Sequence, residues 1–433
     1  MQTEQAKPTF NEHFKRFWQS AFGVSDAHDL YDRSIVLLAL ALAMLGLIMV
    51  ASASLPYAMR EFDNPLHFVI RHGIYLVLAA GIALFVVQLP LSWWEKYNPY
   101  LLMAALLLLV AVLIMGRTVN GATRWLAIGP INIQAAEPAK LFFFAYLAGY
   151  LVRREQEIKQ NLKGFLKPLA VFFVLALLLL MQPDLGTVIV MFATTVGLLF
   201  LAGSKLIQFF SLFLTGIFAI VLLIVVEPYR MRRILSFMDP WADPFGNGYQ
   251  LTQSLMAYGR GDWFGMGLGN SIQKLDYLPE AHTDFVFAIL AEEFGYFGVG
   301  LVVIALFCLV GKTLSLGNRA MAAERPFAGY VAYAIAIWMS FQSAVNIGAS
   351  AGLLPTKGLT LPLVSYGGSS LIVMSIAIAL IVRIDHELRL MKTQATRRSV
   401  NSLVKAKNKS NKKAKSDEQT AAVITTQEAL LNE

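Results

Sequence analysis

The feature that most constrains this chain is a series of long apolar runs. A helix that crosses the hydrocarbon core of a bilayer, about 30 Å thick, needs roughly 20 predominantly apolar residues. These runs lie near residues 34–54, 69–89, 99–116, 138–152, 168–182, 187–203, 206–227, 285–311, 327–353 and 362–384, and the run near 138–152 is the weakest. The pattern predicts an all-α polytopic integral membrane protein with about ten transmembrane helices.

Composition supports this fold class. Hydrophobic residues make up 57% of the chain and charged residues only 15%, whereas soluble domains have roughly 45–50% and 25%. The first apolar run begins more than thirty residues into the chain and is too long for a signal-peptide core, so we expect a retained span. The single cysteine, Cys308, lies inside an apolar run and has no partner for an intramolecular disulfide.

Basic residues in the short loops predict the orientation of the spans, because loops rich in Lys and Arg stay on the cytoplasmic side. Those that follow the fourth and eighth spans are Arg153, Arg154, Lys159, Lys163, Lys167, Lys312, Arg319 and Arg325. Together with a basic C-terminal tail, they place both termini in the cytoplasm. The longest loop, at about 228–284 between spans seven and eight, then faces the periplasm. Long loops of this kind are usually functional, and we expect short helices in it, packed on the outer membrane face.

The chain divides into a cytoplasmic N-terminal segment (1–32), a membrane domain (33–390) and a C-terminal tail (391–433). Aromatic residues at helical spacing beside basic ones, from Phe10 to Trp18, fit a helix in the head-group region; chance aromatics in a disordered tail are the alternative. The C-terminal tail is polar and is expected to be disordered. It carries nine basic and no acidic residues from Lys392 to Ser416, which fits anionic membrane lipids and makes nucleic acid an improbable partner.

Several kinds of chemistry find no support in the sequence. The chain has no P-loop, and its glycine-rich stretches are not strand-to-helix turns. It also lacks the paired histidines or clustered cysteines of a metal centre. Polar residues near the outer ends of the spans remain, where charge at membrane depth is costly and usually functional.

The densest polar segment runs from Lys274 to Asp284, and it places Glu280, His282 and Asp284 just before the eighth span. Titratable groups at a boundary between water and an apolar interior can have shifted pKa values, which is what a general base needs. The alternative interpretation is that Thr283 and Asp284 simply cap the following helix.

Three further polar groups lie near span ends. Gln182 and Asp184 stand in a turn between two spans, where a plain polar hairpin would look the same. Arg124 precedes Gln134, Glu137 and Lys140, of which the last two can form a structural charge pair inside the fourth span. A stretch of glycines, prolines and hydroxyls carries Lys357 and Ser369 and fits either an anion site or a bent helix start.

These segments, in this order on a frame of ten spans, resemble the SEDS family of shape, elongation, division and sporulation proteins, most closely its division branch. The likeness runs from about Tyr31 to Arg389. The motifs are Gln182-Pro-Asp-Leu-Gly-Thr187, Gly248-Tyr-Gln-Leu-Thr-Gln-Ser254, Leu278-Pro-Glu-Ala-His-Thr-Asp284-Phe285 and the run from Pro355 to Ser370. One departure is that the family usually has Gln-Pro, a small residue and Glu, where this chain has Gln134-Ala-Ala-Glu137-Pro138.

The resemblance implies a peptidoglycan glycosyltransferase that polymerises lipid II at the division septum and releases undecaprenyl pyrophosphate. It places the catalytic acidic residue on Asp284, which we expect to act as general base. The candidate substrate-binding residues are Arg124, Glu137, Lys140, Gln182, Asp184, Gln253, Lys274, Glu280, His282, Lys357 and Ser369. Of these, Arg124, Lys274 and Lys357 are the candidate cations for the diphosphate leaving group, with a divalent ion such as Mg²⁺ or Mn²⁺ as a further candidate.

By the same resemblance, the expected partners in the bacterial inner membrane are a class B penicillin-binding transpeptidase of the FtsI type and a regulatory complex of the FtsQ, FtsL and FtsB type. Two rival functions are a lipid II flippase and a scaffold of the division complex. A flippase needs a polar route on both sides of the membrane, whereas the informative residues here cluster at the outer side. A scaffold needs no titratable cluster at all.

Overall fold

The computed structural model describes residues 30–119, 122–128, 131–355 and 358–394. The predicted interfacial helix near the N-terminus, Lys357 and the tail beyond residue 394 lie outside these ranges. The described residues form two units, one up to Ile384 and one from Asp385 on. In the second unit, Arg389 Nε donates to Asp385 Oδ2 at 2.7 Å, one helical turn away.

Each predicted apolar run overlaps a long helix. These helices are α2 (Arg33–Phe62), α3 (His67–Gln88), α4 (Leu91–Met115), α5 (Ala136–Arg153), α7 (Leu162–Met181), α8 (Leu185–Leu201), α9 (Leu206–Val226), α12 (Val286–Ala322), α13 (Pro326–Ser350) and a last helix (Gly368–Gln394). By length and composition, 8 of the described helices can cross a membrane; α8 is shorter, and α5 carries three charged residues. The predicted helical, multi-pass fold class is confirmed.

Shorter elements connect these helices. Helix α6 (Glu155–Gln160) follows α5, and the loop predicted between spans seven and eight contains α10 (Pro228–Met238) and α11 (Tyr249–Gly261). The sequence did not predict the small antiparallel sheet between α4 and α5, formed by β1 (Arg117–Val119), β2 (Ala122–Ile128) and β3 (Ile131–Gln134). In its register Trp125 lies opposite Gln134. Helix α5 then begins at Ala136, so Pro138 falls in the first turn, where a proline is tolerated.

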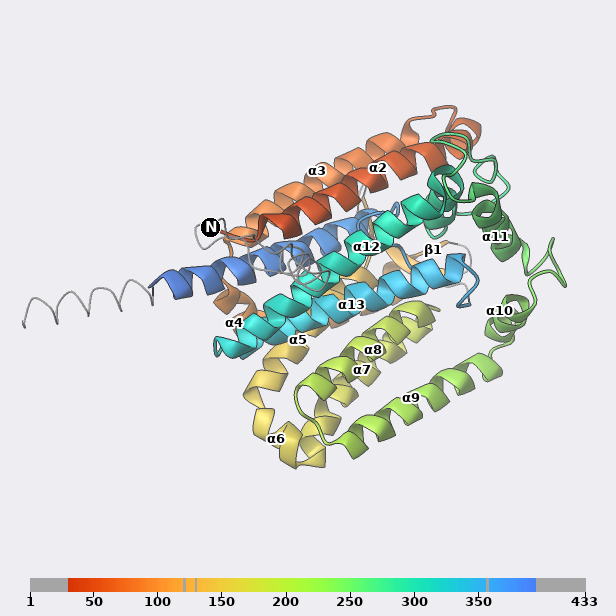
Figure 1. The fold of residues 1–433 in the computed structure, drawn as a ribbon. Helices are drawn as coiled ribbons and strands as arrows, with labels where there is room; N and C mark the ends of the chain where they lie inside the picture. The colour runs from red at the N-terminus through yellow and green to blue at the C-terminus, as the bar shows by residue number, and fades with distance from the viewer. Residues whose placement is uncertain (1–29, 120–121, 129–130, 356–357, 395–433) are drawn as a thin grey trace, which may run out of the picture. The chain divides into compact units, whose positions relative to one another are not determined.

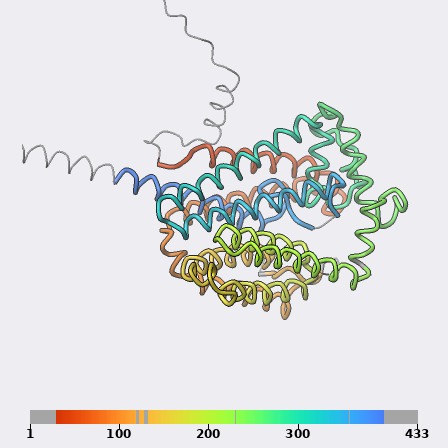
Figure 2. Tube along the Cα trace, turned by 60° about the horizontal axis from the view of Figure 1, so that its bottom comes forward, coloured from red at the N-terminus to blue at the C-terminus, as the bar shows by residue number. Residues whose placement is uncertain are grey.

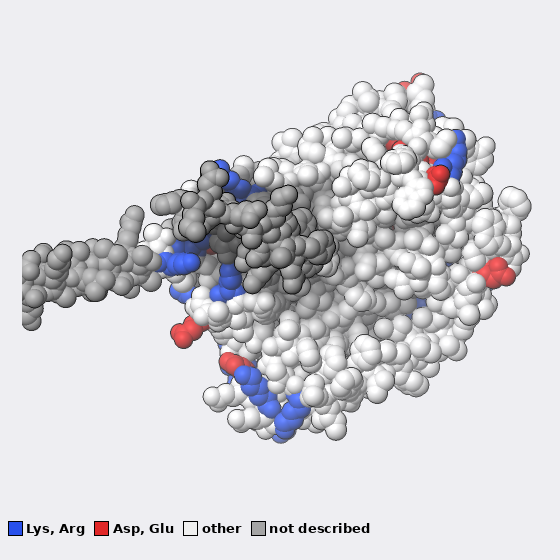
Figure 3. Space-filling model, in the orientation of Figure 1, with Lys and Arg blue, Asp and Glu red and all other residues white. Residues whose placement is uncertain are grey.

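Helices α5 and α13 form the centre of the molecule. Helix α13 packs against α12, α8 and α5, and α12 packs against α2 and α11. Figures 1 and 2 show α6–α9 grouped on one side and α2, α3 and α12 on the other. Helix α9 is apolar on all sides and contributes only Gly216 to the buried residues, as expected of a helix whose surroundings are lipid. On the face drawn in Figure 3, charged residues gather at two opposite ends and leave a wide uncharged band between them.

Helix α12 is broken at Gly295, although its apolar run predicted a continuous span. Gly295 has φ +65° and ψ −169°, which divides the helix into an outer half (286–294) and an inner half (296–322). This backbone conformation is open almost only to glycine. The outer half begins directly after Asp284, so the break decides how the segment that carries Asp284 is mounted.

Candidate active site

Asp284 lies in the turn that leads into the outer half of α12. The Asn346 side chain of α13 donates to the backbone oxygen of Asp284 at 3.0 Å and to that of Leu359 at 2.6 Å. A Cβ added to Gly358 would lie 3.3 Å from Asp284 Oδ2 and 3.9 Å from Arg124 Nη1. Glycine at 358 therefore leaves room for a carboxylate and a guanidinium that border the same backbone position.

The surroundings of Asp284 favour its protonated form more than water does. Burial raises the pKa of the Asp284 carboxyl to about 7, and the charges of Glu280 and Asp184 add to the rise, while those of Arg124 and Arg233 oppose it. The side chain is half-buried rather than sealed, so a substrate can reach it. A carboxylate with a pKa near the working pH accepts and releases a proton readily, as a general base must.

Arg124 projects from β2 and joins the sheet to the turn between α7 and α8. Its Nε donates to the Gln182 backbone oxygen at 3.2 Å, and its Nη2 donates to the Pro183 backbone oxygen. Gln182 is buried, and its side chain donates to the Leu109 backbone oxygen at 3.0 Å. Asp184 caps α8 by accepting from the Thr187 N–H at 3.3 Å and hydroxyl at 2.8 Å. The α7–α8 turn thus fixes Arg124 next to Asp284.

Glu137 and Lys140 form a charge pair inside the bundle. Lys140 Nζ donates to Glu137 Oε1 and to Gln342 Oε1, both at 2.9 Å. The Gln342 amide nitrogen in turn donates to the Thr360 backbone oxygen at 2.9 Å. Lys140 is fully buried and Glu137 nearly so, and their contacts lead to the segment after residue 357. The pair therefore helps to position, through Gln342, the backbone at Thr360.

Ser369 connects that segment to the sheet. Its hydroxyl accepts from the Gln134 N–H at 3.0 Å and donates to the Asn132 backbone oxygen at 3.4 Å. The Tyr366 N–H donates to the His282 backbone oxygen at 3.0 Å. Segment 358–370 therefore touches both the sheet that carries Arg124 and the loop that carries Asp284.

His282 and Glu280 precede Asp284 in the same loop and have different environments. The His282 ring is buried against Phe68, with ring centres 4.5 Å apart, and against the rings of Tyr57 and Tyr366. Burial lowers the pKa of His282 and so favours its neutral ring, and the Glu280 charge opposes this. Glu280 is exposed and accepts from the Thr283 hydroxyl at 2.6 Å.

Lys274 and Gln253 are both buried, Gln253 on α11 and Lys274 in the following loop. The Lys274 ammonium donates to Glu293 Oε1 and to the Ser52 hydroxyl, each at 2.8 Å. Its charge is therefore already paired inside the protein, whereas Arg124 donates to the neutral backbone oxygens of residues 182 and 183.

Sequence reasoning missed Gln342 and Asn346, which hold the two sides of the site. Both lie on α13 and are separated by one helical turn. Polar amides that recur at this spacing in an otherwise apolar span are a usable signal, because an unpaired amide is costly there. It also missed Arg233 on α10, whose charge acts on the Asp284 carboxyl.

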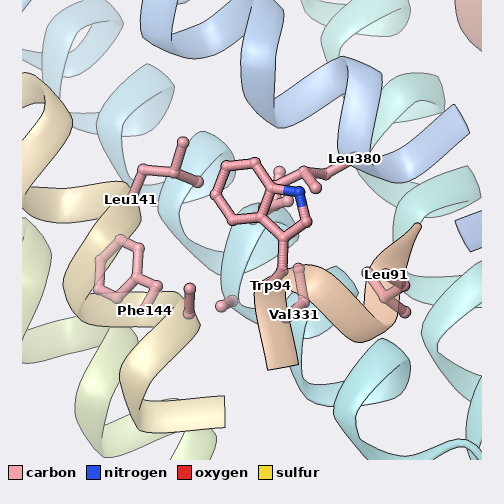
Figure 4. A pocket seen from close by; sticks show the side chains of 9 residues that line it. Leu91, Trp94, Leu141, Phe144, Val331 and Leu380 are labelled. Carbon is pink, nitrogen blue, oxygen red and sulfur yellow. The ribbon is translucent and has the colours of Figure 1, made fainter. Parts of the chain in front are cut away.

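Two other features do not form a second centre of chemistry. Across the described ranges, no three His, Cys, Asp or Glu side chains lie close enough together to hold a metal ion. The pocket in Figure 4 is lined by apolar side chains of α4, α5, α13 and the last helix, among them Leu91, Trp94, Phe144 and Leu380. It shares no residue with the site around Asp284.

Sequence comparisons place the chain among cell-division enzymes. The model of the cell cycle protein family FtsW, RodA and SpoVE matches residues 32–390. A probable peptidoglycan glycosyltransferase FtsW of Alteromonas naphthalenivorans is 67% identical over 86% of this chain and 72% of its own length. The FtsW proteins of Aeromonas salmonicida and Escherichia coli O6:H1 are 60% and 54% identical over 86% of this chain and 94% and 90% of their own lengths.

Solved structures show the same fold. One, described as structural coordination of polymerization and crosslinking by a peptidoglycan synthase complex, matches with a TM-score of 0.67 and 31% identity over 83% of this chain and 98% of the other. The rod shape determining protein RodA of Thermus thermophilus matches with a TM-score of 0.62 and 29% identity over 83% of this chain and 97% of its own.

Proposed function

Since the chain belongs to the FtsW, RodA and SpoVE family of cell cycle proteins, we propose that it polymerises lipid II with Asp284 as the general base. It is a multi-pass membrane protein and a peptidoglycan glycosyltransferase. The observation that carries the role of Asp284 is its position: a half-buried carboxylate with a pKa of about 7 that borders the same glycine as Arg124.

In the proposed reaction, the Asp284 carboxylate takes the proton from the sugar 4-hydroxyl of an acceptor lipid II. The hydroxyl oxygen forms a bond to the anomeric carbon of the donor, and the bond from that carbon to the diphosphate breaks. The electron pair leaves on undecaprenyl pyrophosphate, and the proton on Asp284 passes to solvent or to the leaving group. General base assistance of this kind contributes about 10² to 10⁴ in rate.

Arg124 is the best placed of the described cations to stabilise the leaving diphosphate. Its planar guanidinium suits paired phosphate oxygens, and the backbone oxygens of residues 182 and 183 already orient it. Lys274 is committed to Glu293, which makes it a weaker candidate. A divalent cation such as Mg²⁺ would be held here mainly by the substrate's diphosphate, because Mg²⁺ commonly binds one or two carboxylates together with phosphates.

We place the enzyme in the bacterial inner membrane at the division septum, with a class B penicillin-binding transpeptidase and a complex of the FtsQ, FtsL and FtsB type as partners. The structural similarity to a peptidoglycan synthase complex that coordinates polymerization with crosslinking supports the transpeptidase partner. Anionic membrane lipids are the expected contact of the basic tail.

The test is polymerisation of purified lipid II by the full chain, co-purified with its transpeptidase and read on a gel. We compare the wild type with Asp284→Asn and with Asp276→Asn. Asp276 is a matched control because it lies in the same loop and its carboxylate pairs with Arg60 at 2.7 Å. We expect full yield from the wild type and the control, and a loss of about 10² to 10⁴ from Asp284→Asn.

Equal polymer from all three proteins would remove Asp284 from the chemistry. Polymer from none of them, with each well folded, would move the assignment to a flippase or a scaffold. Vesicles that report the movement of labelled lipid II across the bilayer then separate these two functions.

A further inference from the structure

The outer half of α12 carries two consecutive glutamates, Glu292 and Glu293, that the reaction itself does not use. Their exposed fractions are 0% and 1%. A buried carboxylate is costly unless charge and hydrogen bonds compensate it, so the partners of each indicate what it is there for.

Glu292 binds the loop that follows α11. Its Oε1 accepts from the Ile272 N–H at 2.9 Å, and its Oε2 accepts from the Gln273 N–H at 3.3 Å and from the Ser271 hydroxyl. Arg260, at the end of α11, donates to Oε1 at 2.8 Å and supplies the opposite charge. One side chain thus fixes residues 271–273 and the end of α11.

Glu293 binds the next loop residue and a neighbouring helix. Its Oε1 accepts from Lys274 Nζ at 2.8 Å and from the Ser52 hydroxyl of α2 at 2.6 Å. Lys274 also donates to the Ser52 hydroxyl at 2.8 Å, which closes a triangle of three groups. The loop, α2 and the outer half of α12 therefore meet at one buried charge pair.

The main chain of the same two glutamates holds the loop as well. At the break, the Met266 and Gly267 N–H groups donate to the backbone oxygens of Glu292 and Glu293, both at 3.0 Å. In the other direction, the Tyr296 N–H donates to the Asp262 backbone oxygen at 2.8 Å. The loop thus satisfies backbone groups that a helix end leaves unpaired.

These contacts affect the position of Asp284, because Asp284 lies in the chain between the loop at 271–274 and the outer half of α12. Residues 271–274 are held by the outer half of α12, and the chain runs from them through Asp284 into the first turn of the same half-helix. Every residue from Val286 to Glu293 is buried, so this half-helix is a rigid mount. Arg124 comes from β2, a separate element, and any shift of the mount changes the distance between Asp284 and Arg124.

We propose that Glu292 and Glu293 are positioning residues that lock the loop at 271–274 to the outer half of α12 and thereby hold Asp284 in register with Arg124. This inference rests on the proposed function of Asp284. Lys274 then serves as the counter-ion of Glu293 rather than as a ligand of the diphosphate. Because a misplacement of about 1 Å can cost about 10² in rate, loosening this lock lowers turnover without touching the substrate.

The experiment compares Glu292→Gln and Glu293→Gln with Asp32→Asn in the full chain bound to its transpeptidase. Asp32 is the matched control because it forms a buried ion pair between α2 and α12, with Lys312 at 3.3 Å, at the opposite end of these helices. Per folded molecule, we expect kcat to fall about 10- to 100-fold in both glutamine variants with KM within about twofold. Asp32→Asn keeps kcat. The acidic limb of the pH profile moves to lower pH in the glutamine variants, since a displaced Asp284 is less buried.

Milder variants and a second readout cover a glutamine variant that does not fold. Ser52→Ala and Ser271→Ala each remove one hydrogen bond to a glutamate without leaving a buried charge unpaired, and we expect a several-fold fall in kcat. Amide hydrogen exchange of residues 271–285 should accelerate in these variants and stay unchanged in Asp32→Asn. This readout does not need activity, so it tests the lock even if the wild type makes no polymer. Unchanged exchange together with unchanged kcat and pH profile would overturn the inference.

Discussion

The two halves of α12 are continuous in sequence but differ in what surrounds them. In the outer half every side chain from Val286 to Glu293 is buried, whereas the inner half exposes large apolar side chains, among them Phe297, Leu301 and Phe307. Lys274 pairs with Glu293 in the outer half, and Lys312 of the inner half pairs with Asp32 at the start of α2. The outer pair adds a loop to the two helices, and the inner pair does not. The outer half is built like the core of a soluble enzyme, and the inner half like an ordinary membrane helix.

The largest difference between the two halves of α12 is expected when a glycine is replaced by alanine at the break or in the inner half. In Gly295→Ala, the new Cβ would collide with the Gly265 nitrogen and lie 2.6 Å from the Trp263 carbonyl carbon, at a φ of +65°. The backbone conformation alone costs about 1–3 kcal/mol, and the collision adds to it. We expect little folded protein by size-exclusion chromatography in detergent.

Gly300→Ala in the inner half is the control for this variant. A Cβ at Gly300 meets nothing within 4 Å, and alanine is favoured over glycine inside a helix by roughly 0.5–1 kcal/mol. This variant should fold as well as the wild type or better. Equal folding of both glycine variants would mean that the break in α12 is not a fixed feature.

The next largest effect is expected from Arg124, which borders Gly358 together with Asp284. Arg124→Gln keeps a hydrogen-bond donor but removes the positive charge that would stabilise the negative charge developing on the diphosphate. Loss of one such stabilising group typically costs about 10² to 10³ in kcat. Single-turnover kinetics with purified lipid II measures it, and Arg230→Gln on α10, whose Nη1 donates to the Leu223 backbone oxygen, serves as the comparison. A similar loss in both variants would point to general charge rather than to Arg124.

A smaller effect is the pH dependence of the wild type. A general base works only when it is deprotonated, and the pKa of Asp284 lies at about 7. Polymerisation should therefore be flat above about pH 8 and fall about tenfold for each unit below about pH 6. An acidic limb near pH 4, the ordinary pKa of an aspartate, would show that Asp284 is as well hydrated as a surface carboxylate.

The smallest expected effect is a stability gain in Asp284→Asn. Because the pKa of this carboxyl is raised on folding from 3.8 to about 7, its ionisation is less favourable in the folded state than in the unfolded state, and stability decreases as the pH rises through this range. The asparagine variant, which cannot ionise, should unfold a few degrees above the wild type at about pH 8. This difference should shrink toward pH 4. A difference that does not depend on pH would have another cause.

The sequence predicts the helices well and their interlocking poorly, for a physical reason. Crossing a bilayer requires a local run of apolar residues, so each long helix can be predicted from its own segment of the sequence. The break at Gly295 lies inside such a run and depends on hydrogen bonds from the loop at 262–267, which is too short to form an apolar run of its own. The sheet that holds Arg124 was missed because two of its strands, β1 and β3, have only 3 and 4 residues.

In the candidate site, too, some residues could be predicted from the sequence while their contacts could not. Asp284 and Arg124 were predicted from motifs, and the structure brings them to the same glycine, Gly358. The partners of Lys274 could not be read from the sequence, because Ser52 lies 222 residues away and Glu293 lies on the far side of the Asp284 turn. Long-range pairing of this kind follows from the packed structure alone.

Asn346 has a consequence for how this enzyme can change over time. Its amide group has two hydrogens, and the nitrogen donates to the Asp284 and Leu359 backbone oxygens alike. One nitrogen atom therefore holds both the turn that carries Asp284 and the segment beyond residue 357, in addition to the hydrogen bond from the Tyr366 N–H to the His282 backbone oxygen. In a chimaera that takes one of these segments from a distant relative and keeps the other, Asn346 can lose one of its two hydrogen bonds. The two segments and this asparagine should be inherited, and exchanged by protein engineers, as one unit.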